Sequence, residues 1–260
     1  MAEYVWDHDL TGEADRLRLM ADLLDPSSEF HLLRIGIGAG WRCLEIGAGS
    51  GSLSQWLAQR VGSGGHVIAS DIRTDLMEGI AGHNLEVRKF DVAQDEPPDA
   101  PYDLIAVRAL LHHLPERRAV VSKVARWLKP GGYLLIQEPD FYPTWTVEPP
   151  SQKQFWEQFI QWAAAHQIDY YVGRKVPAWL QAEGLVSISS EGHAILYNGG
   201  SPFAEWWDDG IREVADKVQT AGVISEATLD EFFTLYRDPT YWTTTIAFTA
   251  TTAQHPIETN

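Results

Sequence analysis

The sequence is poor in cysteine, in long apolar runs and in positive charge. Cys43 is the single cysteine among 260 residues, so no intramolecular disulfide can form and nothing calls for an oxidising compartment. Its apolar neighbours favour an ordinary buried residue over a reactive thiol. No apolar run reaches membrane-spanning length, and the charged N-terminus lacks the apolar segment of a signal peptide. We therefore expect a soluble cytoplasmic protein with no membrane partner.

Basic residues are outnumbered: 20 Lys and Arg stand against 36 Asp and Glu, a formal net charge of -16 at pH 7. A surface of this sign repels phosphate backbones, which argues against a nucleic-acid partner, although the charge also serves solubility. Hydrophobic residues make up 45% of the chain, enough for one α/β domain with a sizeable core.

The most informative stretch runs from Arg42 to Asp71. Residues 43–46 and 66–69 are short apolar runs, which predict two buried parallel strands. Between them the sequence predicts a sharp turn and then an amphipathic helix. The turn glycines are Gly47, Gly49 and Gly51, and the apolar helix positions are Leu53, Trp56, Leu57 and Val61.

This strand–turn–helix–strand unit predicts a site for a nucleoside-containing cofactor. Ligands of doubly wound sheets lie beyond the carboxyl ends of the strands, where Asp71 can accept hydrogen bonds from ribose hydroxyls. The spacing is G-x-G-x-G, whereas a dinucleotide site favours G-x-G-x-x-G. Glu45 stands two residues before the first glycine, and two carboxylates suit a ligand with positive charge and no phosphate. A glycine turn without a ligand is the less favoured alternative.

At these residues the chain resembles class I S-adenosylmethionine-dependent methyltransferases, whose first motif is E/D-x-G-x-G-x-G. The resemblance covers residues 42–138 and points to the small-molecule, natural-product branch. Further matching segments are Asp91-Val92, the L-H-H-L-P segment 111–115 and the L-K-P-G-G-Y-L-L-I segment 128–136. It implies a doubly wound, seven-stranded, mostly parallel α/β sheet, the Rossmann-like methyltransferase fold, with helical insertions that form a lid.

The resemblance also implies S-adenosyl-L-methionine as the cofactor and assigns its contacts. Asp71 would hold the ribose, Asp91 the adenine amino group, and Val92 would pack beside the ring. For Asp91 the alternative is a turn-capping aspartate. The full implied set is Glu45, Gly47, Ala48, Gly49, Asp71, Ile72, Asp91, Val92 and Arg108.

The predicted organisation is an N-terminal helical cap over 1–40 and a methyltransferase domain over 41–260, with lid insertions at about 139–176 and 199–238. In the cap, Asp25-Pro26 is expected to end one helix before a second begins. Residues 74–81 are expected to form a helix, 202–237 two helices, and 242–251 the last strand.

The insertions are rich in aromatic residues, which favours an apolar or aromatic small-molecule acceptor. Trp156, Phe159 and Trp207 represent the predicted acceptor wall. Trp156 and Phe159 belong to a helical apolar stripe, and such a stripe is more often ordinary core than the wall of a substrate pocket.

His112 and His113 follow the expected fourth strand and are the candidate catalytic residues, because histidine titrates near neutrality. A hydrogen-bonded core histidine is the alternative for each, and His113 is favoured over His112 as the residue that lines the site. Methyl transfer from a sulfonium is an in-line displacement that needs a base only for some acceptors. The segment lacks the N/D-P-P-Y/F pattern of base-methylating enzymes and an acidic residue at the strand end, and no metal site is predicted. Glu138 and Asp140 either orient the acceptor or cap a turn, and the turn is favoured.

Two other functions stay open at this point. One is an NAD(P)-dependent oxidoreductase, disfavoured by the glycine spacing and the K-P-G-G segment. The other is a cofactor-binding protein of the same fold that catalyses a rearrangement without methyl transfer. The acceptor, the methylated atom and the oligomeric state, with a homo-oligomer among the alternatives, are not determined by the sequence.

Overall fold

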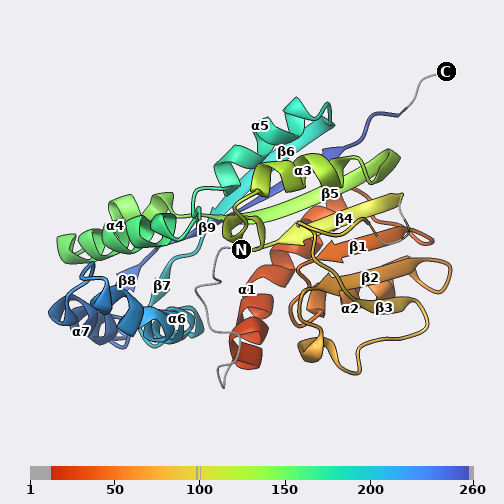
Figure 1. The fold of residues 1–260 in the computed structure, drawn as a ribbon. Helices are drawn as coiled ribbons and strands as arrows, with labels where there is room; N and C mark the ends of the chain where they lie inside the picture. Colours follow the sequence, from red (N-terminus) through yellow and green to blue (C-terminus); the bar gives the residue numbers. More distant parts are fainter. Residues whose placement is uncertain (1–12, 98, 100, 258–260) are drawn as a thin grey trace.

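The computed structural model describes residues 13–97, 99 and 101–257, and its centre is a seven-stranded sheet (Figure 1). The strand order is β3-β2-β1-β4-β5-β9-β6, parallel from β3 to β5, with β9 antiparallel to both neighbours. This confirms the predicted fold class. The strands are β1 (Arg42–Ile46), β2 (His66–Asp71), β3 (Leu85–Lys89), β4 (Tyr102–Arg108), β5 (Leu128–Asp140), β6 (Val186–Ala194) and β9 (Ala247–Gln254).

Helices cover both faces of the sheet because its central strands are apolar on both sides. Cys43 and Leu44 of β1 are fully buried in two different core clusters, as the alternation of side chains along a strand requires. The Cys43 side packs against α1 (Glu13–Arg34) and α2 (Ser52–Val61). The Leu44 side packs against α3 (Arg117–Ala125) and α5 (Val176–Ala182). Burial of Cys43 raises the pKa of its thiol, which fits the predicted core role.

The expectation that Asp25-Pro26 ends the first helix is wrong. Helix α1 is continuous from Glu13 to Arg34 with Pro26 inside it. An interior proline costs about 3 kcal/mol of helix stability. Here the helix is held on both sides of the proline, since Leu24 and Leu32 are buried against the rest of the molecule. Burial of these residues outweighs the local penalty.

Two further local expectations are wrong. Residues 74–81 contain only a short 3-10 helix at Asp75–Met77, because Gly79 adopts φ +82° and breaks the segment. The last strand does not run unbroken over 242–251: β8 (Trp242–Thr243) pairs with β7 (Tyr197–Asn198) in a separate small sheet, and β9 begins at Ala247.

A helical lobe lies beyond one end of the sheet (Figure 1). It contains α4 (Pro150–Ala165), α6 (Pro202–Thr220) and α7 (Glu226–Leu235), which confirms two helices within 202–237. Ser201 and Ser225 cap α6 and α7 through their side chains, as their sequence positions indicate. The division into a cap, a main domain and a lid stays a prediction, and residues 1–12 of the cap lie outside the described residues. Among the described helices, none combines the length and apolar character that a membrane crossing needs.

Candidate functional site

A cavity of about 470 Å³ opens at the carboxyl ends of the central strands, within the size range of small-molecule pockets. Its wall comes from α1, from the turns that follow the parallel strands, and from the helical lobe. The cavity brings together most of the predicted site residues: Gly47, Ala48, Gly49, Asp71, Ile72, Asp91, Val92, Arg108, His112, His113 and Trp207. Glu45, Trp156 and Phe159 do not line it.

The glycine turn needs its glycines. Gly49 and Gly51 have φ +56° and +76°, in the left-handed region where other residues are strained. A Cβ on Gly51 would also lie 2.2 Å from the side chain of Ile80. The N–H of Gly49 donates to Oδ2 of Asp71 at 3.0 Å, so the turn and the acidic residue after β2 form one unit.

Asp71 and Asp91 lie on the same cavity wall, each held by backbone groups. Oδ1 of Asp71 accepts the N–H of Arg73 at 3.0 Å, and Oδ1 of Asp91 accepts the N–H of Ala93 at 2.9 Å. Asp91 therefore caps a turn, as the alternative interpretation states, and also faces the cavity. Apolar side chains of Ile72 and Val92 accompany the carboxylates, an arrangement suited to a ligand with hydroxyl groups and a planar ring.

Glu45 lies beneath the turn rather than at the cavity. Its side chain is buried, and Ser54 donates a hydrogen bond to Oε2. Burial raises the pKa of Glu45 to about 7, against the lowering effects of the nearby Arg108 and of the Ser54 hydrogen bond. The predicted direct contact between Glu45 and a cofactor is not what this geometry provides.

Arg108 at the end of β4 ties helix α1 to the site. Its guanidinium pairs with Asp25 and lies 3.4 Å from the Ser28 hydroxyl. The hydroxyl of Ser52 donates to the same Asp25 at 3.2 Å. No sequence pattern indicates this role of Asp25, because its partners Arg108 and Ser52 lie far away along the chain. The N-terminal half of α1 thereby forms part of the cavity wall through Arg16, Leu17, Met20 and Ala21.

The two histidines lie in a short 3-10 helix, Leu111–His113, that is held by Glu138 at the end of β5. The Glu138 carboxylate accepts the backbone N–H groups of Leu110, Leu111 and His112 at 2.9, 2.7 and 3.2 Å. It also lies 2.9 Å from Nδ1 of His112. The prediction that Glu138 caps a turn is confirmed.

Asp140 also caps a turn, since its carboxylate accepts the N–H of Tyr142 at 3.1 Å. Both carboxylate oxygens of Asp140 additionally accept hydrogen bonds from the Arg174 guanidinium, each at 2.7 Å.

Burial lowers the pKa of His112 to about 3, with Arg117 as a second cause, so the imidazole is neutral at pH 7. Burial raises the pKa of Glu138 to about 7, while its three backbone hydrogen bonds oppose the rise. In the tautomer that carries its proton on Nδ1, the neutral imidazole donates to the ionised Glu138 and keeps the lone pair on Nε2. The His113 ring packs against it with ring centroids 3.8 Å apart, and both rings line the cavity.

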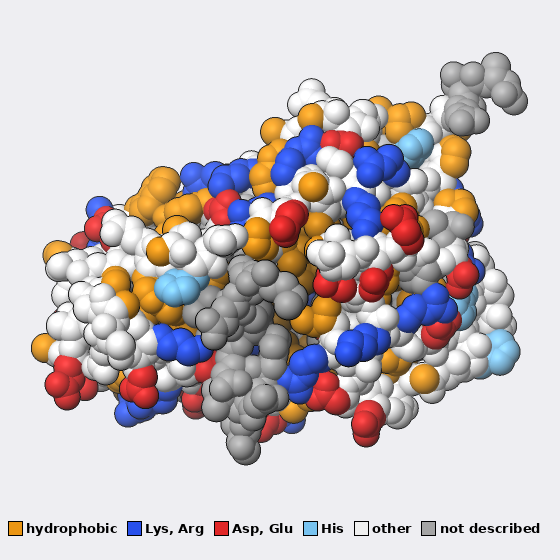
Figure 2. Space-filling model, in the orientation of Figure 1, with side chains coloured by type: hydrophobic (Ala, Val, Ile, Leu, Met, Phe, Trp, Pro, Cys, Tyr) orange, Lys and Arg blue, Asp and Glu red, His pale blue; other side chains and the backbone are white. Residues whose placement is uncertain are grey.

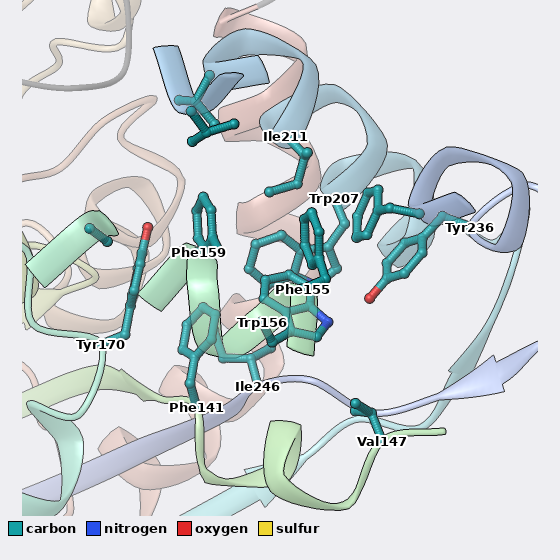
Figure 3. Close-up of a cluster of buried hydrophobic side chains, with 14 of the residues drawn as sticks. Phe141, Val147, Phe155, Trp156, Phe159, Tyr170, Trp207, Ile211, Tyr236 and Ile246 are labelled. Atoms are coloured by element: carbon teal, nitrogen blue, oxygen red, sulfur yellow. The ribbon is translucent and has the colours of Figure 1, made fainter. Parts of the chain in front are cut away.

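The aromatic wall differs from the predicted one. Trp156 and Phe159 of α4 have no exposed surface and pack in the core of the helical lobe (Figure 3). Phe141, Tyr170 and Trp207 lie between this core and the cavity and do line it. Phe141 and Tyr170 come from loops whose direction the sequence pattern does not show, which is why they were missed.

Comparison with known proteins shows which family the residues of this cavity belong to. Residues 7–190 match the model of a family described as "Methyltransferase domain". The chain belongs to this methyltransferase family. Since its glycine turn and acidic residues lie at one cavity, the cofactor is S-adenosylmethionine.

The curated relatives of this chain include two that are named for quinone biosynthesis. A ubiquinone biosynthesis O-methyltransferase of Xylella fastidiosa is 36% identical over 106 residues, covering 38% of this chain and 42% of its own length. The ubiquinone/menaquinone biosynthesis C-methyltransferase UbiE of Cellvibrio japonicus is 31% identical over 139 residues, covering 48% and 55%. The chain thus spans about half the length of the curated relatives it matches.

Solved structures share the fold at low identity. Phosphoethanolamine N-methyltransferase 2 of Haemonchus contortus, solved with phosphomonomethylethanolamine and S-adenosylhomocysteine, is 18% identical with a TM-score of 0.56, covering 88% of this chain and 52% of its own. The [4+2]-cyclase SpnF is 17% identical with a TM-score of 0.57, covering 90% and 82%.

The cavity has the features that S-adenosylmethionine needs. The left-handed glycine turn leaves backbone exposed where a side chain would fill the space, and Asp71 and Asp91 offer acceptor oxygens for hydroxyl and amino groups. Asp71, Asp91 and Val92 would hold the nucleoside, and residues 47–49 the amino-acid end. The same cavity continues to the histidines and to the aromatic wall.

Proposed function

We propose that this protein transfers the methyl group of S-adenosylmethionine to a small apolar or aromatic acceptor. The observation that carries the proposal is the continuity of one cavity. The same cavity is lined by Asp71 and Asp91 on one side and by Phe141, Tyr170 and Trp207 on the other. An acceptor between the aromatic rings would lie beside the cofactor, as an in-line displacement requires.

The volume and the relatives support a small acceptor. About 470 Å³ is shared by cofactor and acceptor, so the group that enters beside the cofactor must be small. The two curated relatives are named for O- and C-methylation in quinone biosynthesis. Under this proposal α4 and α6 act as the lid, with α6 contributing Trp206 and Trp207 to the wall.

The histidine pair is proposed to assist the transfer. The bound cofactor supplies an electrophilic methyl group on a sulfonium. Glu138 fixes the His112 ring through Nδ1, and because the pKa of His112 is lowered to about 3, its Nε2 would accept a hydrogen bond from the acceptor and not its proton. His113, which also lines the cavity, would accept the proton of a hydroxyl or acidic carbon of the acceptor. Such proton transfer contributes typically about 10²- to 10⁴-fold to the rate.

The test uses methyl-labelled S-adenosylmethionine with a panel of phenols, electron-rich aromatics and aliphatic amines. We expect labelled product from the aromatic acceptors and one S-adenosylhomocysteine released per product. His113→Asn removes the proposed proton acceptor, so with a phenolic acceptor kcat should fall about 10²- to 10⁴-fold at unchanged cofactor affinity. The matched neighbour His112→Asn keeps a donor toward Glu138 and should mainly raise KM for the acceptor.

Two results would reject parts of this proposal. Conversion of an acceptor without release of S-adenosylhomocysteine would indicate a non-methylating reaction, of which the [4+2]-cyclase shows that the fold is capable. A His113→Asn enzyme with normal kcat on phenols would show that His113 is not the proton acceptor and would leave alignment as the source of the rate. Binding of NAD(P) without binding of S-adenosylmethionine would instead indicate an oxidoreductase.

A further inference from the structure

Three side chains outside the cavity form a cluster of metal-ligating groups: His31 near the end of α1, and Glu191 and His193 on β6. Each offers one ligand atom, and the three atoms all lie within 4.8 Å of one another. Glu191 and His193 are two residues apart on a strand, so they project from the same face of the sheet. They pair with Ala250 and Phe248 of β9, the strand that α1 packs against.

His31 is the buried member of this cluster. Only 4% of the residue is exposed, and within the described part of the chain its Nε2 has no hydrogen-bond partner. A buried polar atom left without a partner costs about 1–3 kcal/mol, so such atoms call for an explanation. The His31 and His193 rings lie with centroids 6.3 Å apart. A cation held between them would satisfy the buried imidazole.

The Glu191 carboxylate is divided between two neighbours. Arg34, one turn beyond His31 on α1, pairs with Oε1, while Oε2 lies 3.9 Å from Nε2 of His193. Arg34 thus orients the carboxylate, as outer partners of metal ligands commonly do, and leaves one oxygen for an ion. Its charge offsets that of Glu191, which disfavours Ca²⁺ and Mg²⁺ because these ions depend on several oxygen ligands.

The donor set therefore selects ions that prefer imidazole. Two histidines and one carboxylate with open positions suit Zn²⁺ and similar divalent transition metals. The His193 side chain is 59% exposed and that of Glu191 36%, so an ion can approach from solvent and keep water ligands. An ion about 2.1 Å from each donor needs donor atoms about 3.4 Å apart, which small side-chain rotations provide.

We propose that His31, Glu191 and His193 form a divalent transition-metal site that fixes the end of helix α1 to the edge strand β6. The site is separate from the methyl-transfer cavity, because the last cavity residue on α1 is Ala21, about 15 Å away along the helix axis. Since the first half of α1 lines that cavity, the ion would anchor a helix that forms part of the cofactor site.

Calorimetry on the full-length, tag-free, metal-stripped protein tests the proposal, with Zn²⁺ as the probe and Mg²⁺ as the comparison ion. We expect one Zn²⁺ per chain, no heat with Mg²⁺, and a higher unfolding temperature in Zn²⁺. His193→Ala and Glu191→Gln alter partly exposed side chains and should fold normally, and each should weaken Zn²⁺ binding by about 100-fold or more. His83→Ala, at an exposed histidine away from the cluster, is the matched control and should bind as the parent does.

Three outcomes would overturn the site. They are no Zn²⁺ binding to the parent protein, unchanged affinity in His193→Ala, and an equal loss of affinity in His83→Ala. The unfolding temperature of His193→Ala should also stop responding to Zn²⁺, and a retained response would place the ion elsewhere. None of these readouts depends on methyl-transfer activity.

Discussion

At the scale of single residues, Asp71 carries the clearest prediction for cofactor binding. Its carboxylate faces the cavity at the end of β2, and a hydrogen bond to such a group contributes about 1.5–3 kcal/mol. Asp71→Asn keeps the size of the side chain and an oxygen acceptor for Gly49, but removes the charge and the second acceptor that Arg73 uses. We expect the affinity for S-adenosylhomocysteine, measured by calorimetry, to fall about ten- to a hundred-fold.

The matched control for Asp71 is Asp75→Asn. Asp75 lies in the same segment and pairs with Arg73, but its side chain is half exposed and does not line the cavity. The control should bind the cofactor as the parent does. An unchanged affinity in Asp71→Asn would make Asp71 a structural cap of the glycine turn and nothing more.

Glu45 predicts a pH dependence of stability. Burial raises its pKa from 4.5 to about 7, so between these values the folded state holds a proton that the unfolded state has released. The resulting stability is fully present below pH 4.5 and is lost as the pH rises through 7. Glu45→Gln should therefore flatten the fall in the free energy of unfolding between about pH 5 and 8, measured by urea titration.

Glu138 shares the raised pKa of about 7, so the slope should diminish in Glu45→Gln rather than disappear. The exposed Glu78 provides the control: Glu78→Gln should keep the parental slope. If Glu45→Gln and Glu78→Gln give the same pH profile, the carboxyl of Glu45 does not hold a proton in the folded protein near neutrality.

At the scale of elements, short sequence motifs correctly predicted the cofactor side of the cavity. The strand, glycine turn and following carboxylate lie within 30 residues of sequence, and Gly47, Asp71 and Asp91 all reach the cavity as predicted. Elements held by distant contacts were predicted less well. Helix α1 continues through Pro26 because one of its faces is buried, and the sequence around Pro26 does not indicate that burial.

The aromatic wall of the cavity was also only partly predictable from the sequence. Helical spacing predicted α4, and the start signal Ser201-Pro202 predicted α6, but neither signal says which side of a helix faces a ligand. Phe159 of α4 is buried in the lobe, whereas Trp207 of α6 lines the cavity. The cluster of His31 with Glu191 and His193 was also beyond sequence analysis, since it joins segments from opposite halves of the chain.

This difference between α4 and α6 can be measured. Phe159→Ala removes a fully buried ring and should lower the free energy of unfolding by about 3–5 kcal/mol, while KM for the acceptor stays unchanged in the folded enzyme. Trp207→Phe keeps an aromatic ring in the core and should raise KM for the acceptor with little loss of stability. A raised KM without destabilisation in Phe159→Ala would place Phe159 at the acceptor after all.

At the scale of the whole molecule, the cavity is lined both by residues that match the family model and by residues that lie beyond it. The family model ends at residue 190, before α6 (Pro202–Thr220), which supplies Trp206 and Trp207. The cofactor turn and both histidines lie inside the match. We therefore expect the choice of acceptor to depend on α6 and its neighbours more than on the sheet.

The surface charge of the whole molecule predicts which substrates it rejects. The formal charge is -16, and on the face in Figure 2 basic side chains are interspersed with acidic ones rather than gathered in a stripe. Binding to a nucleic-acid backbone needs several Lys or Arg side chains to displace counterions together. The protein should therefore not be retained on columns of immobilised DNA or tRNA at about 0.15 M salt. Incubation with methyl-labelled cofactor should transfer no label to either nucleic acid. If the protein is retained on either column and the retention weakens steeply with added salt, or if label is transferred to tRNA, the protein has a local basic surface despite its negative net charge.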